Sequence, residues 1–246
     1  MTVSLNVSHL TKRFVRPDGT WTTPVDDLSL TLEAGKIAAV IGESGCGKTT
    51  FLRLLAGLEV PEQGEVRWVK AGEAQQPRIG VVFQEHRLFP WMTVAQNILV
   101  ALRDKPQHAA MARLNDVLEL TGLLSARDLL PRELSGGMQQ RVGLARALAP
   151  EPDVLLLDEA FSALDALTRQ RLYHDFMTIH AANPVTTILV THDVTEAVLL
   201  SSQIWRMANG KTISHYEVPL PYPRRLGEPL VGSLSENILN DFFHLT

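Results

Sequence analysis

The sequence predicts an α/β fold in which a mainly parallel β-sheet is packed between helices. Three runs are almost entirely apolar, as in strands that are covered on both faces: Ile37 to Ile41, Val154 to Leu157 and Thr187 to Val190. Residues from about 85 to 150 show helical periodicity with no convincing strand. This stretch predicts a helical subdomain inserted into the α/β core.

Turn residues divide the rest of the chain into segments in which apolar residues recur at the spacing of a strand or of a helix. Strands are expected near 3–8, 27–32, 36–41, 64–69, 78–83, 153–157, 185–191, 203–208 and 211–216. Helices are expected at 93–102, 107–121, 137–149, 166–181 and 194–200. Residues 16–23 have a loop-like composition, and 70–77 and 219–225 are expected to be surface connections. The prolines of 219–225 exclude a regular helix or a central strand there.

The end of the chain predicts one more helix, at 232–243. Ser235 is a plausible cap for it, and Leu234, Ile238, Leu239 and Phe242 would share one face. About 30 residues after the last strand are too few for a typical independent domain. We therefore expect a single domain over 1–246, with a helical subdomain at about 85–150 and a tail at about 217–246.

Composition limits the classes of function. The chain has 246 residues with a formal charge of -4, so no global basic field attracts nucleic acid, and we expect no nucleic-acid partner. The single cysteine, Cys46, excludes an internal disulfide and fits a reduced, cytosolic setting. Residues 1–14 lack the apolar core of a signal peptide, and no apolar run is long enough to span a bilayer.

A phosphate-binding loop follows the first apolar strand. Residues 42–49, GESGCGKT, fit the pattern G-x-x-x-x-G-K-[ST], in which glycines let backbone N–H groups point at phosphate oxygens. Lys48 would reach the β- and γ-phosphates and Thr49 would ligate Mg²⁺. A glycine-rich turn that binds nothing is the alternative, but the buried strand before the loop and the apolar helix after it favour a P-loop NTPase core. The predicted ATP-binding residues are Gly42, Ser44, Gly45, Cys46, Gly47, Lys48, Thr49 and Thr50.

Two acids complete the predicted nucleotide chemistry. Asp158 and Glu159 follow the apolar run 154–157, so a buried strand would deliver both carboxylates at its tip. Asp158 would bind Mg²⁺, directly or through water, and Glu159 would polarise the attacking water. The alternative is a pair of acids that caps a helix.

Residues 134–141, LSGGMQQR, resemble the signature motif of ATP-binding cassette (ABC) ATPases. Other matches follow in that family's order: Gln84 as in its Q-loop, residues 162–165 (SALD) as in its D-loop, and residues 191–193 (THD) as in its H-loop. The resemblance covers about 3–216. It implies a P-loop NTPase core with a mainly parallel sheet, an N-terminal antiparallel β portion and an inserted helical subdomain.

The resemblance also implies roles. Glu159, His192 and Gln84 would be catalytic, with His192 on the γ-phosphate and Gln84 sensing the metal and the water. Phe14 would stack on adenine, and Trp21 is the alternative. Two copies would pair head to tail around two ATP molecules, each completing the other's site. The second copy's contribution would be Ser135, Gly136 and Gly137, which precede or begin a predicted helix that could also be an ordinary capped helix.

The resemblance implies that ATP hydrolysis drives a separate integral-membrane permease. The permease would dock just after the Q-loop, on residues 84–94, where Leu88, Phe89 and Trp91 offer apolar surface beside Pro90. Packing of the subdomain is the alternative role for these side chains. The runs at 88–94 and 191–198 and the proline-rich tail are similar to importer ATPases for nitrate, sulfonates, taurine, bicarbonate and pyrimidine precursors.

We therefore expect a peripheral protein on the cytoplasmic face of the inner (plasma) membrane, served indirectly by an extracytoplasmic solute-binding protein. A soluble ABC ATPase that acts on nucleic acid or in assembly is the competing hypothesis. Such proteins usually carry coiled-coil insertions or two cassettes, and this sequence has neither. A non-hydrolysing sensor is disfavoured because Glu159 and His192 are both present.

Overall fold

The structure is a computed structural model that describes residues 2–85, 87–162 and 164–244. His86 of the expected docking segment and Ala163 of the D-loop-like motif lie outside the described residues. The chain divides into two compact units, residues 1–76 with 186–246, and residues 77–185. Each unit is described by itself below.

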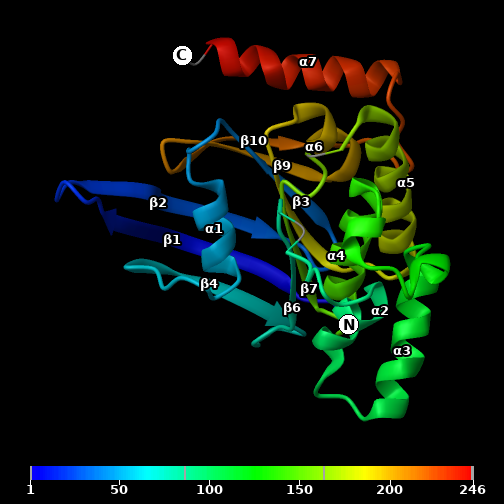
Figure 1. Ribbon diagram of the computed structural model, residues 1–246. Coiled ribbons are helices and arrows are strands. Elements are labelled where there is room, and N and C mark those ends of the chain that lie inside the picture. The colour runs from blue at the N-terminus through cyan, green and yellow to red at the C-terminus, as the bar shows by residue number, and fades with distance from the viewer. Residues whose placement is uncertain (1, 86, 163, 245–246) are drawn as a thin grey trace. The chain divides into compact units, whose positions relative to one another are not determined.

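The first unit begins with an antiparallel sheet. Its strands are β1 (Ser4–Val15), β2 (Trp21–Leu32), β4 (Gln63–Lys70) and the short β5 (Glu73–Ala74), in the order β2-β1-β4-β5. β1 pairs antiparallel with both β2 and β4, which confirms the expected N-terminal antiparallel portion. The two long strands form a ribbon that Figure 1 shows in blue.

The first unit also contains four strands of a second, mainly parallel sheet. Within the unit its order is β10 (Lys211–Glu217), β9 (Gln203–Ala208), β3 (Ile37–Ile41) and β8 (Thr186–Thr191). β3 runs parallel to β8 and β9 and is buried along its whole length, as its apolar sequence predicts. The unit also contains α1 (Lys48–Leu55), α6 (Val194–Leu200) and α7 (Pro229–His244), and α7 packs against α6.

The second unit combines two parallel strands with helices. β6 (Ile79–Val82) and β7 (Val154–Asp158) pair in parallel. Between them in sequence come α2 (Val94–Leu99), the 3₁₀ turns η1 (Val100–Leu102), η2 (Leu124–Ala126) and η3 (Pro131–Glu133), and the longer helices α3 (Gln107–Leu120) and α4 (Gly136–Leu148). α5 (Ala166–Ala182) follows β7. The helical part has its own apolar core, which includes Ile98, Leu114, Val117 and Val142.

Most expected elements are confirmed, but several expectations are wrong. β1 and β2 are longer than expected, and the short β5 lies within the expected connection 70–77. Residues 21–23 belong to β2, so the loop-like reading of 16–23 fails at its end. The last helix begins at Pro229, and Ser235 lies inside it, where its hydroxyl donates to the Val231 carbonyl instead of capping a terminus. Ile238 is fully buried, but Leu239 is 40% exposed and does not share its face.

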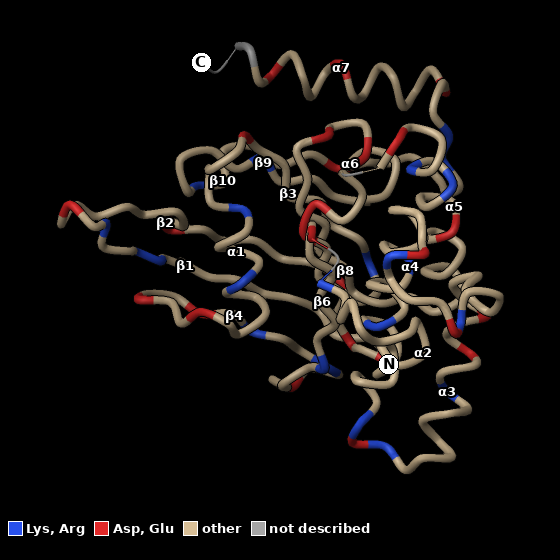
Figure 2. The backbone as a smooth tube through the Cα atoms, viewed as in Figure 1, with Lys and Arg blue, Asp and Glu red and all other residues tan. Residues whose placement is uncertain are grey.

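No helix among the described residues is both long and apolar enough to cross a membrane. Acidic and basic residues are interspersed along the described chain, and neither sign dominates a long stretch of it (Figure 2).

Candidate functional site

The P-loop is pressed between two strands of the first unit. A Cβ at Gly42 would lie 2.3 Å from the Met207 carbonyl oxygen of β9. A Cβ at Gly47, where φ is 113°, would lie 1.7 Å from the Pro24 carbonyl oxygen of β2. The Gly210 amide, in the turn between β9 and β10, donates to the Cys46 carbonyl at 3.1 Å. Glycine is therefore required at both positions by close backbone packing, independently of any ligand.

Lys48 begins α1 and is only 5% exposed. Its ammonium group donates to the carbonyl oxygens of Gly42 at 2.8 Å and Glu43 at 2.9 Å, so it lies inside the curl of the loop. No acidic residue occupies the first turn of α1, which leaves the positive end of the helix without a competing carboxylate. Burial raises the pKa of the Cys46 thiol, so this cysteine is a poor nucleophile at neutral pH.

The H-loop-like residues lie beside the P-loop. β3 and β8 are neighbouring parallel strands, and Ile41 is paired with Thr191. Gly42 and His192 directly follow these two strands, so they leave the same edge of the sheet side by side. Because neighbouring strands are about 4.8 Å apart, the first unit brings the start of the P-loop and an exposed imidazole together at that edge.

Hydrogen bonds fix the turn that carries His192. The Thr191 hydroxyl donates to the Glu196 carboxylate and accepts from the Asp193 amide at 3.0 Å. Asp193 caps α6, since its carboxylate accepts from the Glu196 amide at 3.0 Å. The sequence argument missed Glu196 as a supporting residue. The spacing Asp-x-x-Glu at a helix start was the available signal, because it is typical of a capping arrangement.

The two aromatic candidates for an adenine platform occupy different environments. Phe14 is half-buried, and the ammonium of Lys12 lies 5.0 Å from its ring centroid. Trp21 is 66% exposed and sits one pair nearer the hairpin turn, opposite Val15. Because Phe14 pairs with Thr22, the two rings project from opposite faces of the ribbon. Phe14 remains our candidate, since it is half-buried and the Lys12 ammonium already lies over its ring.

The second unit carries the acidic pair. Asp158 ends β7 and is only 6% exposed, whereas Glu159 is half-buried and has φ of 46°. That backbone conformation is uncommon for a residue with a side chain, and strain of this kind is typical of functional sites. The Ser162 amide and hydroxyl both donate to the Glu159 carbonyl, which fixes the tight turn.

The strand pairing of the second unit places Gln84 near these acids. Val82 is paired with Leu157, so Gln84 follows β6 on the same edge at which Asp158 ends β7. Gln84 is exposed there. A buried carboxylate, a half-buried carboxylate and an exposed amide are thus collected at one strand edge.

The signature-like residues begin α4. Ser135 is its N-cap, with the hydroxyl accepting from the Met138 amide at 3.3 Å, so the residue does cap a helix. Ser135 and Gly136 are exposed, whereas Gly137 is buried against α5. A Cβ at Gly137 would lie 2.4 Å from the Thr168 methyl group. Asp165 caps α5, and hydrogen bonds with Thr168 lower the pKa of its carboxyl group.

A buried asparagine shapes the segment after Gln84. Asn97 of α2 is fully buried, and its side chain accepts from the Phe89 amide at 2.8 Å and donates to the carbonyls of Phe89, Met92 and Thr93. The turn it binds displays Trp91, which is 70% exposed and lies 5.7 Å from the Phe89 ring. The sequence argument missed Asn97, whose role depends on tertiary contacts.

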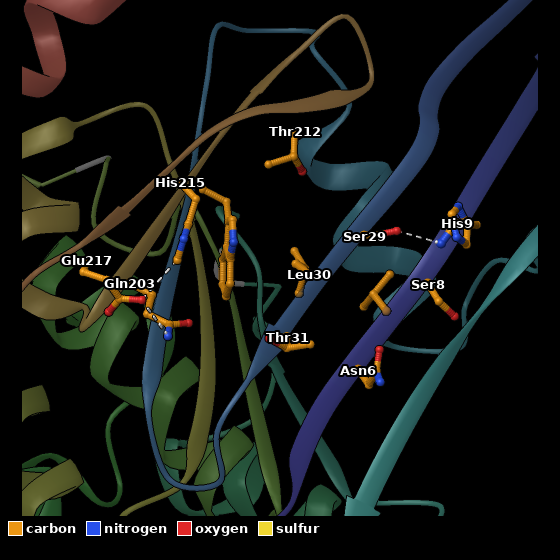
Figure 3. A pocket seen from close by; sticks show the side chains of 12 residues that line it. Asn6, Ser8, His9, Ser29, Leu30, Thr31, Gln203, Thr212, His215 and Glu217 are labelled. Atoms are coloured by element: carbon orange, nitrogen blue, oxygen red, sulfur yellow. Dashed lines mark hydrogen bonds and ion pairs between the residues drawn. The ribbon is translucent and has the colours of Figure 1, made fainter.

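One cavity of about 630 Å³ lies elsewhere in the first unit, between β1, β2, β9 and β10 (Figure 3). Its twelve lining residues include His9, Ser29, Trp205, His215 and Glu217. The Trp205 and His215 rings stack at 5.3 Å. None of the lining residues is lysine or arginine, so this cavity offers no positive charge to a triphosphate.

The expected magnesium ligands fit the ion by chemistry. Thr49 offers a hydroxyl oxygen at the start of α1, and Asp158 offers carboxylate oxygens at the end of β7. Mg²⁺ takes few protein oxygens and shares its remaining positions with water and phosphate, so a dedicated cage is not needed. Among the described residues no cluster of three or more His, Cys, Asp or Glu residues is arranged for a metal.

Comparison with known proteins assigns the family. Residues 25–162 match the model of the ABC transporter family. The chain is 43% identical over 90% of its length, and 88% of the relative, to the aliphatic sulfonates import ATP-binding protein SsuB of Bacillus licheniformis. It is 44% identical over 92% of its length to the bicarbonate transport ATP-binding protein CmpC of Synechococcus elongatus, of which the match spans 35%.

A solved structure agrees. The dimeric ATP-binding cassette MJ0796 in a post-hydrolysis state, bound to ADP and Pi, matches 88% of this chain and 100% of its own with a TM-score of 0.76 at 24% identity. This likeness establishes the α/β P-loop NTPase fold. With a family model that covers more than half of its residues, the chain belongs to the ABC transporter family.

Proposed function

We propose that the chain is the ATP-hydrolysing, energy-coupling subunit of an ABC importer for a small anion or organic solute such as nitrate, sulfonate or taurine. The observation that carries the proposal is its kinship with import ATP-binding proteins, at 43% identity to SsuB across most of both chains. The nitrate import protein NrtC of Synechococcus elongatus is 42% identical over 92% of this chain and 35% of its own.

The site residues divide the chemistry between them. Backbone amides of the P-loop and the Lys48 ammonium bind the phosphates, and Phe14 stacks on the adenine. Glu159 accepts a proton from the attacking water, whose oxygen forms a bond to the γ-phosphorus while the bond to the ADP oxygen breaks. His192 and Gln84 position the γ-phosphate and the water. Thr49, Asp158 and Gln84 would bind Mg²⁺, which neutralises phosphate charge when it is present.

The working form is a head-to-tail homodimer with two ATP molecules. The dimeric state of MJ0796 supports pairing of two copies. In this arrangement Ser135, Gly136 and Gly137 of each copy contact the nucleotide on the other. Ser135 and Gly136 are exposed at the positive end of α4, so they are free to receive the γ-phosphate of a partner's ATP.

A permease converts dimer closure into transport. The Asn97-fixed turn displays Trp91 and Phe89 as the docking surface for an integral-membrane permease. The chain would then work as a peripheral subunit on the cytoplasmic face of the inner membrane, with an extracytoplasmic solute-binding protein delivering the solute to the permease. We infer that the chain is one nucleotide-binding domain, whose helical subdomain spans about 85–150.

The soluble, non-transport alternative is disfavoured, because the relatives named above are transport proteins and the described charges form no basic tract. ATP turnover by the purified chain tests the enzymatic part. We expect magnesium-dependent phosphate release that rises more than linearly with protein concentration, because two copies form each site. Release proportional to concentration, at concentrations where the chain is monomeric by light scattering, would contradict the shared site.

A further inference from the structure

The C-terminal tail contacts the end of α6 before α7 begins. Arg224 lies in the expected surface connection, yet its guanidinium is half-buried and donates to four carbonyl oxygens. These are Ser201 at 2.6 Å, Leu220 at 2.6 Å, Val218 at 3.3 Å, and Val198. Its Nε also donates to Leu220 at 3.1 Å. The adjacent Arg225 is exposed.

Tyr222 completes this contact. Its ring lies 4.1 Å from the Arg224 guanidinium carbon, and its hydroxyl donates to the Leu200 carbonyl at 2.9 Å. We call Tyr222 and Arg224 the tail clasp. The clasp supplies donors to carbonyl groups at the carboxyl end of α6, which have no partner inside the helix. A cation at that end also complements the helix dipole.

The other end of α6 carries His192. The helix has only seven residues, and at its start the Asp193 cap and the bond between Thr191 and Glu196 fix the turn around His192. All but one of its residues are buried, and it packs on β3, β8 and α7. Because α6 is short, buried and hydrogen-bonded at both ends, we expect a displacement at one end to move the other.

We propose that the tail clasp is a positioning device for the ATPase reaction: Arg224 and Tyr222 fix α6, and α6 fixes His192 at the γ-phosphate. The inference rests on the proposed role of His192. The tail after residue 217 lies outside the phosphate and metal sites. The inference is that this tail nevertheless contributes to ATP turnover. Arg224 touches no reacting atom and acts only through the helix.

The test is a double-mutant cycle in ATP turnover by the full chain. Arg224→Lys keeps the charge but cannot serve four carbonyls, and Arg225→Lys is the matched control on the neighbouring arginine. We expect Arg224→Lys to lower kcat by about tenfold, as small displacements of catalytic groups do, with KM and the Kd of an ATP analogue unchanged. Arg225→Lys should leave all three at the wild-type values.

The coupling to His192 separates positioning from general loosening. In a His192→Ala background, Arg224→Lys should change kcat by less than about twofold, because the group it positions is already gone. Tyr222→Phe, which removes one hydrogen bond and keeps the ring, should give a smaller loss than Arg224→Lys and the same dependence on His192. The kcat of Tyr222→Phe tests the same proposal if Arg224→Lys folds poorly.

Three outcomes would overturn the clasp. One is a wild-type kcat for Arg224→Lys, another is an equal loss in both backgrounds, and the third is a loss that appears in the Kd for the analogue. If His192→Ala itself leaves kcat unchanged, the assigned role of His192 fails as well, and the clasp fails with it. A large effect of His192→Ala with an additive effect of Arg224→Lys refutes the clasp alone.

Discussion

Gly47 lies directly against Pro24: a Cβ on the P-loop glycine would be 1.7 Å from the carbonyl oxygen of that β2 residue. The antiparallel ribbon therefore sets the position of the phosphate loop. Both obstacles to a side chain, the backbone contact and φ of 113°, are independent of nucleotide.

Gly47→Ala should therefore damage the loop more than an ordinary glycine substitution does. Gly57→Ala is the matched control, because Gly57 has φ of 68° but open space around its Cβ position. We expect about 1 kcal/mol of destabilisation for the control and clearly more for Gly47→Ala, which should also lose ATP binding. Urea unfolding and calorimetric titration with ATP measure both. Equal destabilisation of the two variants would show that the β1–β2 ribbon moves to accommodate the side chain and does not fix the position of the P-loop.

Glu159→Gln should separate binding from hydrolysis. The amide keeps the shape of the side chain but cannot accept the proton of the attacking water. We expect kcat to fall by about 100-fold or more while the Kd for ATP stays within about twofold of wild type. Glu236→Gln, an exposed acid on α7, is the control. Turnover at the wild-type rate in Glu159→Gln would remove Glu159 from its role.

Gly137 packs closely against Thr168 and has a proposed role at the partner's nucleotide, and a second substitution can separate the two. A Cβ at this residue would meet the Thr168 methyl group at 2.4 Å, so Gly137→Ala should lower stability by displacing α5. Thr168→Ser removes that methyl group. We expect the double variant to recover most of the melting temperature that Gly137→Ala loses.

Recovery of ATP turnover in the double variant is a separate measurement. If turnover recovers with stability, Gly137 serves packing, and the partner's nucleotide is contacted by Ser135 and Gly136. If stability recovers and turnover does not, the Gly137 backbone itself needs to approach phosphate closely. A double variant as unstable as Gly137→Ala would show that the contact with Thr168 is not what requires glycine.

His180 predicts a pH dependence of stability. Burial lowers the pKa of this imidazole below its usual value of about 6.5, and its Nε2 lies 3.1 Å from the Val185 carbonyl. Because the folded-state pKa is depressed, the buried neutral imidazole contributes its full share to the free energy of unfolding above pH 6.5. That contribution is lost as the pH falls through the folded-state pKa, where the ring takes up a proton. His180→Gln should lower this acid sensitivity between pH 7 and 5, measured by urea unfolding. His174→Gln, an exposed histidine on the same helix, should not.

Short-range patterns predicted most of the fold. Apolar strands, glycine positions and helical periodicity can each be recognised from residues that are close together in sequence. β3, β7, β8 and the helices between 94 and 148 are therefore predicted from these patterns. The ribbon was predicted too short because β1 and β2 are irregular. Register shifts after Val7, Leu10 and Lys12 break the alternation of buried and exposed side chains on which strand prediction depends.

Tertiary contacts explain the residues that sequence could not assign. Arg206 interrupts an apolar strand, and the structure gives the reason: it is 5% exposed, donates to the Asp241 carbonyl at 2.9 Å, and lies over the Phe242 ring. It binds the end of α7. Asn97 and Arg224 likewise form hydrogen bonds with backbone groups. Those of Asn97 are in an irregular turn, and some of those of Arg224 are distant in sequence. Pro229 at the start of α7 was an available signal, since proline is favoured in the first turn of a helix.

The measurement that tests the central claim most directly is a tagged pull-down of this protein from detergent-solubilised native membranes, with the co-purifying chains identified by mass spectrometry. A Trp91→Ala variant, which lacks the exposed ring of the proposed docking surface, serves as the comparison. We predict a multi-helix permease with the wild-type protein and little of it with the variant. No permease with the wild-type protein, while the protein is abundant in the soluble fraction, would contradict the importer function and favour a soluble ABC ATPase.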